Sequence, residues 1–277
     1  MKKVPISNIK NYAKKKTIEV SDTSIQTKNK TRAFLKKVAD VVLFILDVFK
    51  QTFSRGFEFS EFMKQCFQIG NKSLGLISIT GVIIGLVLTI QSRPVLVDFG
   101  AESMLPGMVA ISIIREMGPV ITALICAGKI GSSMGAELGS MRVTEQIDAM
   151  EVSSINPVKF LIVPRILAAT LMIPILTLYA DALGIFGSWA GANIKGDVSF
   201  TLFVTQAFSN VEFMDLIPAT IKTFFFGAVI GFVGCYKGYN AGRGTESVGI
   251  AANSAVVLSS LFLIIVDLIA VQITDLL

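Results

Sequence analysis

The amino-acid sequence predicts an all-α integral membrane protein with about five transmembrane helices, preceded by interfacial amphipathic helices. Hydrophobic residues make up 52% of the 277 residues, charged residues make up only 16%, and the mean hydropathy is +0.68. Soluble domains carry a larger share of charged residues. Apolar stretches of the roughly 20 residues that a helix needs to cross a bilayer recur through the last three quarters of the chain. Because these stretches do not alternate apolar and polar residues, they predict helices and not barrel strands.

The first 32 residues are expected to form a basic, disordered cytoplasmic tail. Eleven Lys and Arg stand among residues 1–37, against only Glu19 and Asp22. Such a tail typically lies on anionic lipid and follows the positive-inside rule. The N-terminal sequence lacks a short apolar region with a small-residue cleavage site, so no removable signal peptide is expected.

Residues 33–70 are expected to form interfacial amphipathic helices. The stretch AFLKKVADVVLFILDVFK, residues 33–50, combines a broad apolar face with several charges, which is typical of a helix that lies in the membrane interface. The aromatic-rich stretch FEFSEFMKQCFQIG follows. The first membrane span is then expected from Ser73 to Ile90, ended by the polar residues and proline at 91–94.

The transmembrane domain is expected to cover residues 71–277. After the first span, apolar tracts are expected at about 105–139, 157–193, 216–236 and 248–273. Five spans place the C-terminus outside. The cations then expected inside are Arg142, Lys159, Arg165, Lys237 and Arg243, and the acids expected outside are Asp98, Glu102, Asp197, Glu212 and Asp215. This charge asymmetry supports the predicted topology.

Composition argues against most chemistry within this chain. The sequence contains no histidine, and its three cysteines lie far apart, so no metal site and no cofactor are expected. The segment AGKI at 127–130 resembles the end of a phosphate-binding loop, but Ala123 and Ile130 replace the glycine and the hydroxyl residue that the loop requires. The chain is therefore not expected to be an enzyme, and a separate chain must supply any ATP hydrolysis.

A short polar segment, MRVTEQIDAMEVSS at 141–154, separates the second and third apolar tracts on the predicted cytoplasmic side. On a helical projection, Val143, Ile147 and Met150 share one face, whereas Glu145 and Asp148 lie opposite. The pattern predicts a short amphipathic helix that is acidic on one side. Composition does not decide whether it docks a soluble partner or is an ordinary polar loop or interface helix.

Two long runs carry a resemblance to a known family. The first begins with REMGPVITALICAGKIGSSMGAELGSMRVTEQIDAMEV at Arg115 and continues through INPVKFLIVPR, and the second is GCYKGYNAGRGTESVGIAANSAVVLS. Together they resemble the MlaE/YrbE family, whose members are permease subunits of ABC-type lipid transporters associated with MCE-domain proteins. The resemblance covers roughly residues 70–277 and does not extend to residues 1–32.

The resemblance implies a homodimer in the inner (cytoplasmic) membrane, with an ABC ATPase subunit under each copy and an MCE-domain lipid-binding protein on the outer side. This complex would move phospholipid or a similar hydrophobic lipid across the envelope. Residues 142–152 match the family's coupling helix, on which the ATPase acts. The residues expected to couple to the ATPase are Arg142, Val143, Glu145, Ile147, Asp148, Met150 and Glu151.

Depth singles out Arg115 and Glu116 as candidate substrate-binding residues. At about 1.5 Å per residue, they lie roughly 15 Å inside the second tract, near mid-bilayer. Other intramembrane charges fall near an interface, where long side chains reach water: Lys129, Asp181, Lys222 and Asp267. Arg115 and Glu116 are expected either to line a wet cavity that takes the polar head of the cargo or to form a buried structural pair beside Gly118 and Pro119.

Two other functions stay open from the residues alone. An ion-coupled secondary transporter would use Glu116, Glu137 and Asp181 as relay groups, although the chain has no internal repeat of the kind common in such carriers. A membrane-embedded lipid-modifying enzyme would need the histidines or clustered carboxylates that the sequence lacks. Glycines four residues apart, such as Gly81 and Gly85, allow close helix packing either within one chain or across a homodimer seam.

Overall fold

The computed structural model divides the chain into two compact units, residues 1–50 and 51–277. In the first unit, residues 38–50 are helical. The predicted basic tail lies outside the described residues, apart from Arg32. The residues that the structure describes are 32, 35–36, 38–54, 56–194, 196–209, 211–274 and 276.

Five helical segments of the second unit are long and apolar enough to cross a membrane, which confirms the predicted fold class. They are Phe59–Asp98, Glu102–Val143, Val158–Asn193, Phe213–Tyr239 and Thr245–Thr274. Every element assigned in this unit is a helix. The chain is therefore a multi-pass, all-α membrane protein.

Two of these segments are built from several helical pieces. The second contains η1 Glu102–Met104, α3 Leu105–Ser112, η2 Ile113–Met117, α4 Gly118–Cys126, η3 Ala127–Gly131 and α5 Ser132–Val143. The third contains η4 Val158–Ile162 and α7 Val163–Asn193. The other helices are α2 Phe59–Asp98, α6 Gln146–Val152, α8 Phe200–Ser209, α9 Phe213–Tyr239 and α10 Thr245–Thr274.

Helix α2 is longer at both ends than the sequence predicts. The aromatic-rich stretch after residue 56 is not a separate interfacial helix, because α2 begins at Phe59 and has no boundary near residue 70. At the other end, α2 continues through Pro94 to Asp98. A proline removes one helical hydrogen bond, but near the end of a 40-residue helix the remaining bonds carry it onward. The depth at which this helix enters the membrane stays a prediction.

Three π-helical turns interrupt the second and third spans, and proline accounts for two of them. Turn η2 directly precedes Gly118 and Pro119, and turn η4 is followed by Pro164 in the first turn of α7. A proline ring clashes with the carbonyl four residues earlier, and a wider turn relieves this clash. Turn η3, Ala127–Gly131, has no such proline. Single π-turns of this kind are frequent at functional sites.

Helix α8 lies between the third and fourth apolar tracts, where the sequence predicts no helix. Its Phe203 and Ala207 are buried in a cluster with residues of α3 and α7, such as Ala110 and Ile185. The loop before it is fixed by Asn193, whose side-chain oxygen accepts a 2.9 Å hydrogen bond from the backbone N–H of Val198. Only two of the ten residues of α8 are buried, and two buried residues form too weak a pattern to predict a helix from the sequence.

Helices α2 and α7 pack closely through their glycines. A side-chain carbon at Gly85 would collide with the backbone of Gly184, and one at Gly187 would collide with the backbone of Val82. Glycine faces also bring α9 against α7, at Gly227. These small-residue faces therefore serve packing within the chain, which is one of the two alternatives that their spacing left open.

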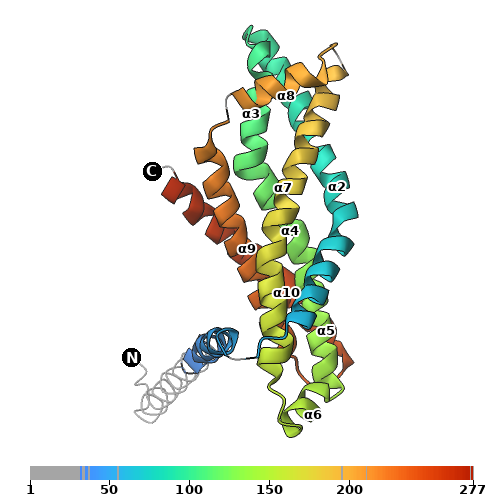
Figure 1. Cartoon of the computed structure of the whole chain (residues 1–277), viewed down its shortest axis with the longest axis vertical. Helices are drawn as coiled ribbons and strands as arrows, with labels where there is room; N and C mark the ends of the chain where they lie inside the picture. Colours follow the sequence, from blue (N-terminus) through green and yellow to red (C-terminus); the bar gives the residue numbers. More distant parts are fainter. Residues whose placement is uncertain are drawn as a thin grey trace, which may run out of the picture. The chain divides into compact units, whose positions relative to one another are not determined.

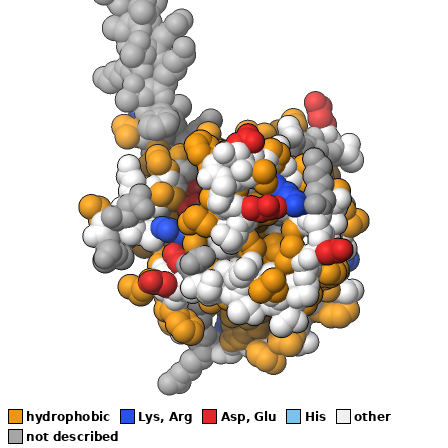
Figure 2. Space-filling model, turned by 90° about the horizontal axis from the view of Figure 1, so that it is seen from above, with side chains coloured by type: hydrophobic (Ala, Val, Ile, Leu, Met, Phe, Trp, Pro, Cys, Tyr) orange, Lys and Arg blue, Asp and Glu red, His pale blue; other side chains and the backbone are white. Residues whose placement is uncertain are grey.

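Two short helices mark the opposite ends of the second unit. Helix α8 lies across the end where α3 begins and α7 finishes, and α6 lies at the other end (Figure 1). Figure 2 views the α8 end, where acidic side chains stand among apolar and uncharged groups. The predicted topology places the α8 end outside and α6 inside.

We predict that Gly85→Ala destabilises the protein, because the added methyl group forces α2 away from α7. Overpacking of this kind typically costs about 1–3 kcal/mol. Gly75→Ala is the matched control, since no atom lies within 4 Å of the position that its methyl group would take. Thermal unfolding in detergent measures both variants. Equal midpoints for the two would show that the α2–α7 contact does not limit stability.

Candidate functional site

A buried lysine joins three helices at one level of the bundle. Lys222 of α9 has a side chain only 5% exposed, and its ammonium donates to Glu116 Oε2 at 2.9 Å and to Asp267 Oδ1 at 3.0 Å. Glu116 lies in η2 and Asp267 in α10. A charge removed from water needs partners of opposite charge, and these two carboxylates provide them.

Arg115, the neighbour of Glu116 in the sequence, pairs with another residue of α9, Asp215. Its Nη1 lies 3.6 Å from Asp215 Oδ1. Asp215 stands in the first turn of α9, where its other oxygen accepts a 2.9 Å hydrogen bond from the backbone N–H of Glu212 and so caps the helix. Asp215 therefore fixes the start of α9 and holds the Arg115 guanidinium beside it.

These ion pairs set the level of Arg115 and Glu116 relative to the other helices. Arg115 lies level with the first turn of α9, and Glu116 shares Lys222 with Asp267, so both lie toward the start of α9 and the end of α10. Helix α3 extends beyond both of these helix ends (Figure 1). The depth of Arg115 and Glu116 in the membrane stays a prediction.

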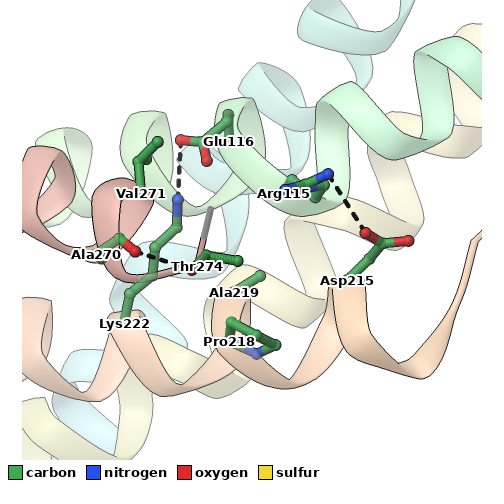
Figure 3. Close-up of a pocket in the computed structure, with 9 residues that line it drawn as sticks. All are labelled: Arg115, Glu116, Asp215, Pro218, Ala219, Lys222, Ala270, Val271 and Thr274. Carbon is green, nitrogen blue, oxygen red and sulfur yellow. Dashed lines mark hydrogen bonds and ion pairs between the residues drawn. The ribbon is translucent and has the colours of Figure 1, made fainter. Parts of the chain in front are cut away.

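The paired charges line a small cavity. Figure 3 shows Arg115 pointing to Asp215 and Lys222 pointing to Glu116, with α10 closing one side through Ala270, Val271 and Thr274. The cavity volume is about 20 Å³, enough for about one water molecule and too small for a lipid headgroup. The Arg115 and Glu116 side chains are nevertheless 40% and 42% exposed, so both are open to a neighbour outside this chain.

The three carboxylates named for an ion relay do not form a continuous path. Glu137 lies about 32 Å further along the second span than Glu116, and it pairs with Arg165 at 3.4 Å. Asp181 of α7 is buried against Gly118, and its Oδ1 has no hydrogen-bond partner among the described residues. Glu116 and Glu137 are each held by a cation. This arrangement disfavours proton transfer along the bundle.

The segment predicted to couple to the ATPase forms α6, but its apolar face points inward. Helix α5 ends at Val143, and Glu145 adopts a left-handed backbone with φ 59° before α6 begins at Gln146. Ile147 is fully buried in this chain. Ile147 is therefore packed within this chain, and the coupling role of residues 142–152 stays a prediction. The surface that α6 offers to a partner includes Gln146, Ala149, Glu151 and Val152.

Charged and aromatic contacts tie α6 to neighbouring helices. Arg142 pairs with Asp148 at 2.5 Å, and its guanidinium lies 5.9 Å from the centre of the Tyr239 ring. The Tyr239 hydroxyl donates to Glu151 Oε1 at 3.1 Å. Met150 is half-buried. Because Tyr239 ends the same helix that carries Lys222, α9 connects the α6 end with the buried charges about 26 Å away.

No group of three or more potential metal ligands occurs among the residues that the structure describes. The sequence identified Arg115 and Glu116 but did not pair them with Asp215 and Lys222. The acids and the lysine are far apart in sequence, so only their placement on packed helices brings them together. The sequence signal that could have identified these residues is the presence of charged residues within apolar tracts.

Comparison with known proteins identifies the family. The family model described as Permease MlaE matches residues 62–273. The chain belongs to the MlaE permease family. It is 38% identical over 203 residues to a probable ABC transporter permease protein of Rickettsia typhi, a match that covers 73% of this chain and 78% of that protein.

Two other MlaE-family relatives carry more specific names. The chain is 36% identical over 208 residues to the intermembrane phospholipid transport system permease protein MlaE of Haemophilus influenzae, covering 75% of this chain and 80% of that protein. It is 33% identical over 207 residues to the chloroplastic protein TRIGALACTOSYLDIACYLGLYCEROL 1 of Arabidopsis thaliana, covering 75% of this chain and 59% of that protein.

We predict that Lys222→Met destabilises this MlaE-family chain, because it leaves Glu116 and Asp267 without their cation. Breaking a buried pair costs about 3–5 kcal/mol, and the partial exposure of Glu116 favours the lower end. The triple variant Lys222→Met, Glu116→Gln and Asp267→Asn removes all three charges and is expected to recover part of the loss. Thermal unfolding in detergent measures this. A triple variant no more stable than Lys222→Met would mean that packing, and not charge, accounts for the effect.

Proposed function

We propose that this chain is the permease subunit of an ABC transporter that moves phospholipid or a similar hydrophobic lipid between the inner membrane and an MCE-type carrier. The observation that carries the proposal is the family match over residues 62–273. The phospholipid transport named for the Haemophilus influenzae relative supports the cargo class. The chain itself is a transport subunit, and a separate ATPase drives it.

The ATPase is proposed to dock on α6. In support, α6 projects at one end of the bundle, and Val152 is 88% exposed there (Figure 1). Of the residues predicted for coupling, Arg142, Asp148 and Glu151 hold α6 in place through the contacts described above. Ile147 anchors α6 to its own chain, and Glu145 forms the bend that precedes it. The ATPase would therefore push on α6 from outside, against a firmly seated helix.

The cargo site is proposed to include Arg115 and Glu116. Arginine offers a planar set of donors that suits phosphate oxygens. Because the cavity within one chain is too small for a headgroup, we infer that the site is completed by a second copy of the permease in a homodimer. The MCE-domain protein would receive the lipid at the outer end, close to these residues.

An ion-coupled secondary transporter is the alternative. It would depend on Glu116, Glu137 and Asp181 as relay groups. In this structure Glu116 is paired with Lys222, and Glu137 is paired with Arg165. Copurification of an ATPase, with lipid transport that requires ATP, would separate the two functions.

We predict that Ala149→Asp combined with Val152→Asp releases the ATPase. Both residues are exposed on α6, and a charge placed in the centre of an interface costs several kcal/mol, enough to dissociate a micromolar partner. Copurification of the ATPase with the tagged permease measures the effect. Ile147 is unsuitable for this test, because a charge at that buried position would unfold α6.

The matched control for the docking variant is Thr201→Asp combined with Thr205→Asp. It adds the same charge to exposed positions of α8, at the opposite end of the bundle. The control is expected to keep a full complement of ATPase. If the α6 variant also keeps it, the proposed docking surface is wrong.

We predict that Arg115→Ala lowers the amount of lipid bound to the purified complex by about tenfold or more, since it removes a charge-assisted contact to phosphate. Arg115→Lys should retain part of the binding, because lysine keeps the charge but not the planar fork. Mass spectrometry of extracted lipid measures occupancy. The stoichiometry of ATPase and outer partner, measured on the same sample, checks assembly.

Asp215→Asn provides the opposite perturbation. It frees Arg115 from its carboxylate partner and keeps a side-chain oxygen for the helix cap. Lipid occupancy should therefore stay the same or rise. Unchanged occupancy and transport in Arg115→Ala would leave the residue with a packing role alone.

A further inference from the structure

A second cavity lies toward the α6 end of the bundle, between α2 and the segment η3–α5. Its volume is about 60 Å³. The α2 wall consists of Gln65, Gln68, Ile69, Lys72 and Ser73, and the opposite wall consists of Lys129, Ile130, Ser133, Met134 and Glu137. This cavity shares no residue with the one that contains Arg115 and Glu116.

The cavity carries an excess of positive charge. Lys72 and Lys129 have no ion pair with any carboxylate among the described residues. Both lysines line the cavity, where the Lys129 ammonium donates to the backbone carbonyl of Lys72 and keeps its other two protons available. The acid in the wall, Glu137, is already bound by Arg165 and Gln68. Two cations are thus left for an anionic group.

Ser73 is an unsatisfied hydrogen-bonding group in the wall of this cavity. Its side chain is buried, with only 2% of the residue exposed, and its hydroxyl has no hydrogen-bond partner among the residues that the structure describes. Elsewhere on the same helix, Ser78 and Thr80 donate to the carbonyl four residues earlier, as hydroxyls in apolar helices usually do. Because a buried hydroxyl without a partner is costly, the geometry favours a ligand that accepts its hydrogen bond.

An apolar strip leads from the cavity along α2. Leu76, Ile79 and Ile83 follow Lys72 on the same helix face, and they are 43%, 62% and 52% exposed. Gly75 and Gly128 lie beside the cavity, and a side-chain carbon added at either glycine would have no neighbouring group within 4 Å. The surface therefore has a cationic, hydrogen-bonding end and an open apolar strip. This arrangement matches the structure of a phospholipid, whose phosphate would lie at Lys72 and Lys129 and whose acyl chains would lie along α2.

We propose that this cavity binds the phosphate of an anionic phospholipid, at a site separate from the cargo site. In the predicted topology the lipid belongs to the cytoplasmic leaflet. A free phosphate ion would satisfy Lys72, Lys129 and Ser73 equally but would leave the apolar strip unused. Lipid binding at this site requires neither ATP nor transport. The test of this proposal therefore does not depend on the proposed function.

The test uses the protein purified from membranes with its accompanying subunits, titrated in detergent and followed by native mass spectrometry. The probes are phosphatidylglycerol, which is anionic, phosphatidylcholine, which has no net charge, and inorganic phosphate. We expect one saturable phosphatidylglycerol site that Lys72→Gln with Lys129→Gln weakens roughly 30-fold, since each cation near anionic lipid contributes about fivefold. Phosphatidylcholine should bind more weakly and respond little to the same change.

Two further variants distinguish this site from general charge effects. Lys64→Gln with Lys237→Gln removes the same charge outside the cavity and should leave binding within about twofold. Ser73→Ala removes a hydroxyl that has no partner, so it should keep the thermal midpoint while weakening phosphatidylglycerol binding about fivefold. A loss of stability without a change in binding would assign Ser73 to packing and overturn its role.

Three results would overturn the proposal. Equal phosphatidylglycerol binding in the Lys72 and Lys129 variant and in its control would mean that these lysines follow only the general charge bias of the inner face. Lysine-dependent binding of inorganic phosphate without lipid binding would make this a phosphate site. A change in the number of permease copies in the Lys72 and Lys129 variant, without lost lipid, would assign the surface to a second copy.

Discussion

The burial of the Lys222 ammonium is the constraint on which the packing of α9, α10 and the second span depends. An ammonium withdrawn from water is tolerated only with partners of opposite charge, and Glu116 and Asp267 reach it from two other helices. This single group thus fixes the second span, α9 and α10 at one level. The same register places Asp215 beside Arg115. The candidate cargo residues are therefore held by the charges that hold the helices together.

Packing supplies the rigidity that these charges need. Helices α2 and α7 approach until backbone touches backbone, because glycines leave no side chains between them. Helix α9 packs on the other side of α7 in the same way, and it is continuous from Asp215 to Tyr239. One rigid helix therefore contacts the buried charges at one end and α6 at the other. If the ATPase docks on α6 as proposed, this continuity would link it directly to the proposed cargo residues.

The two ends of the bundle differ in how their charges are satisfied. Toward the α8 end, Arg93, Arg115 and Lys222 each lie against a carboxylate of the same chain. Toward the α6 end, Arg165 is paired with Glu137, whereas Lys72 and Lys129 line a cavity in which Glu137 is the only carboxylate. The proposed lipid phosphate would give these two lysines the partner that carboxylates give to the cations at the α8 end.

The sequence by itself determined the fold class, the five spans and the site of the polar insert, because long apolar tracts and their charged interruptions are local properties. It also supplied the family and singled out Arg115 and Glu116 as candidate site residues. Tertiary structure decided the partners of those two residues, Asp215 and Lys222, as well as the inward orientation of Ile147, the existence of α8 and the internal use of the glycine faces. Each of these depends on which helix lies beside which. Helical periodicity defines the faces of one helix, but it does not reveal the neighbour that covers them.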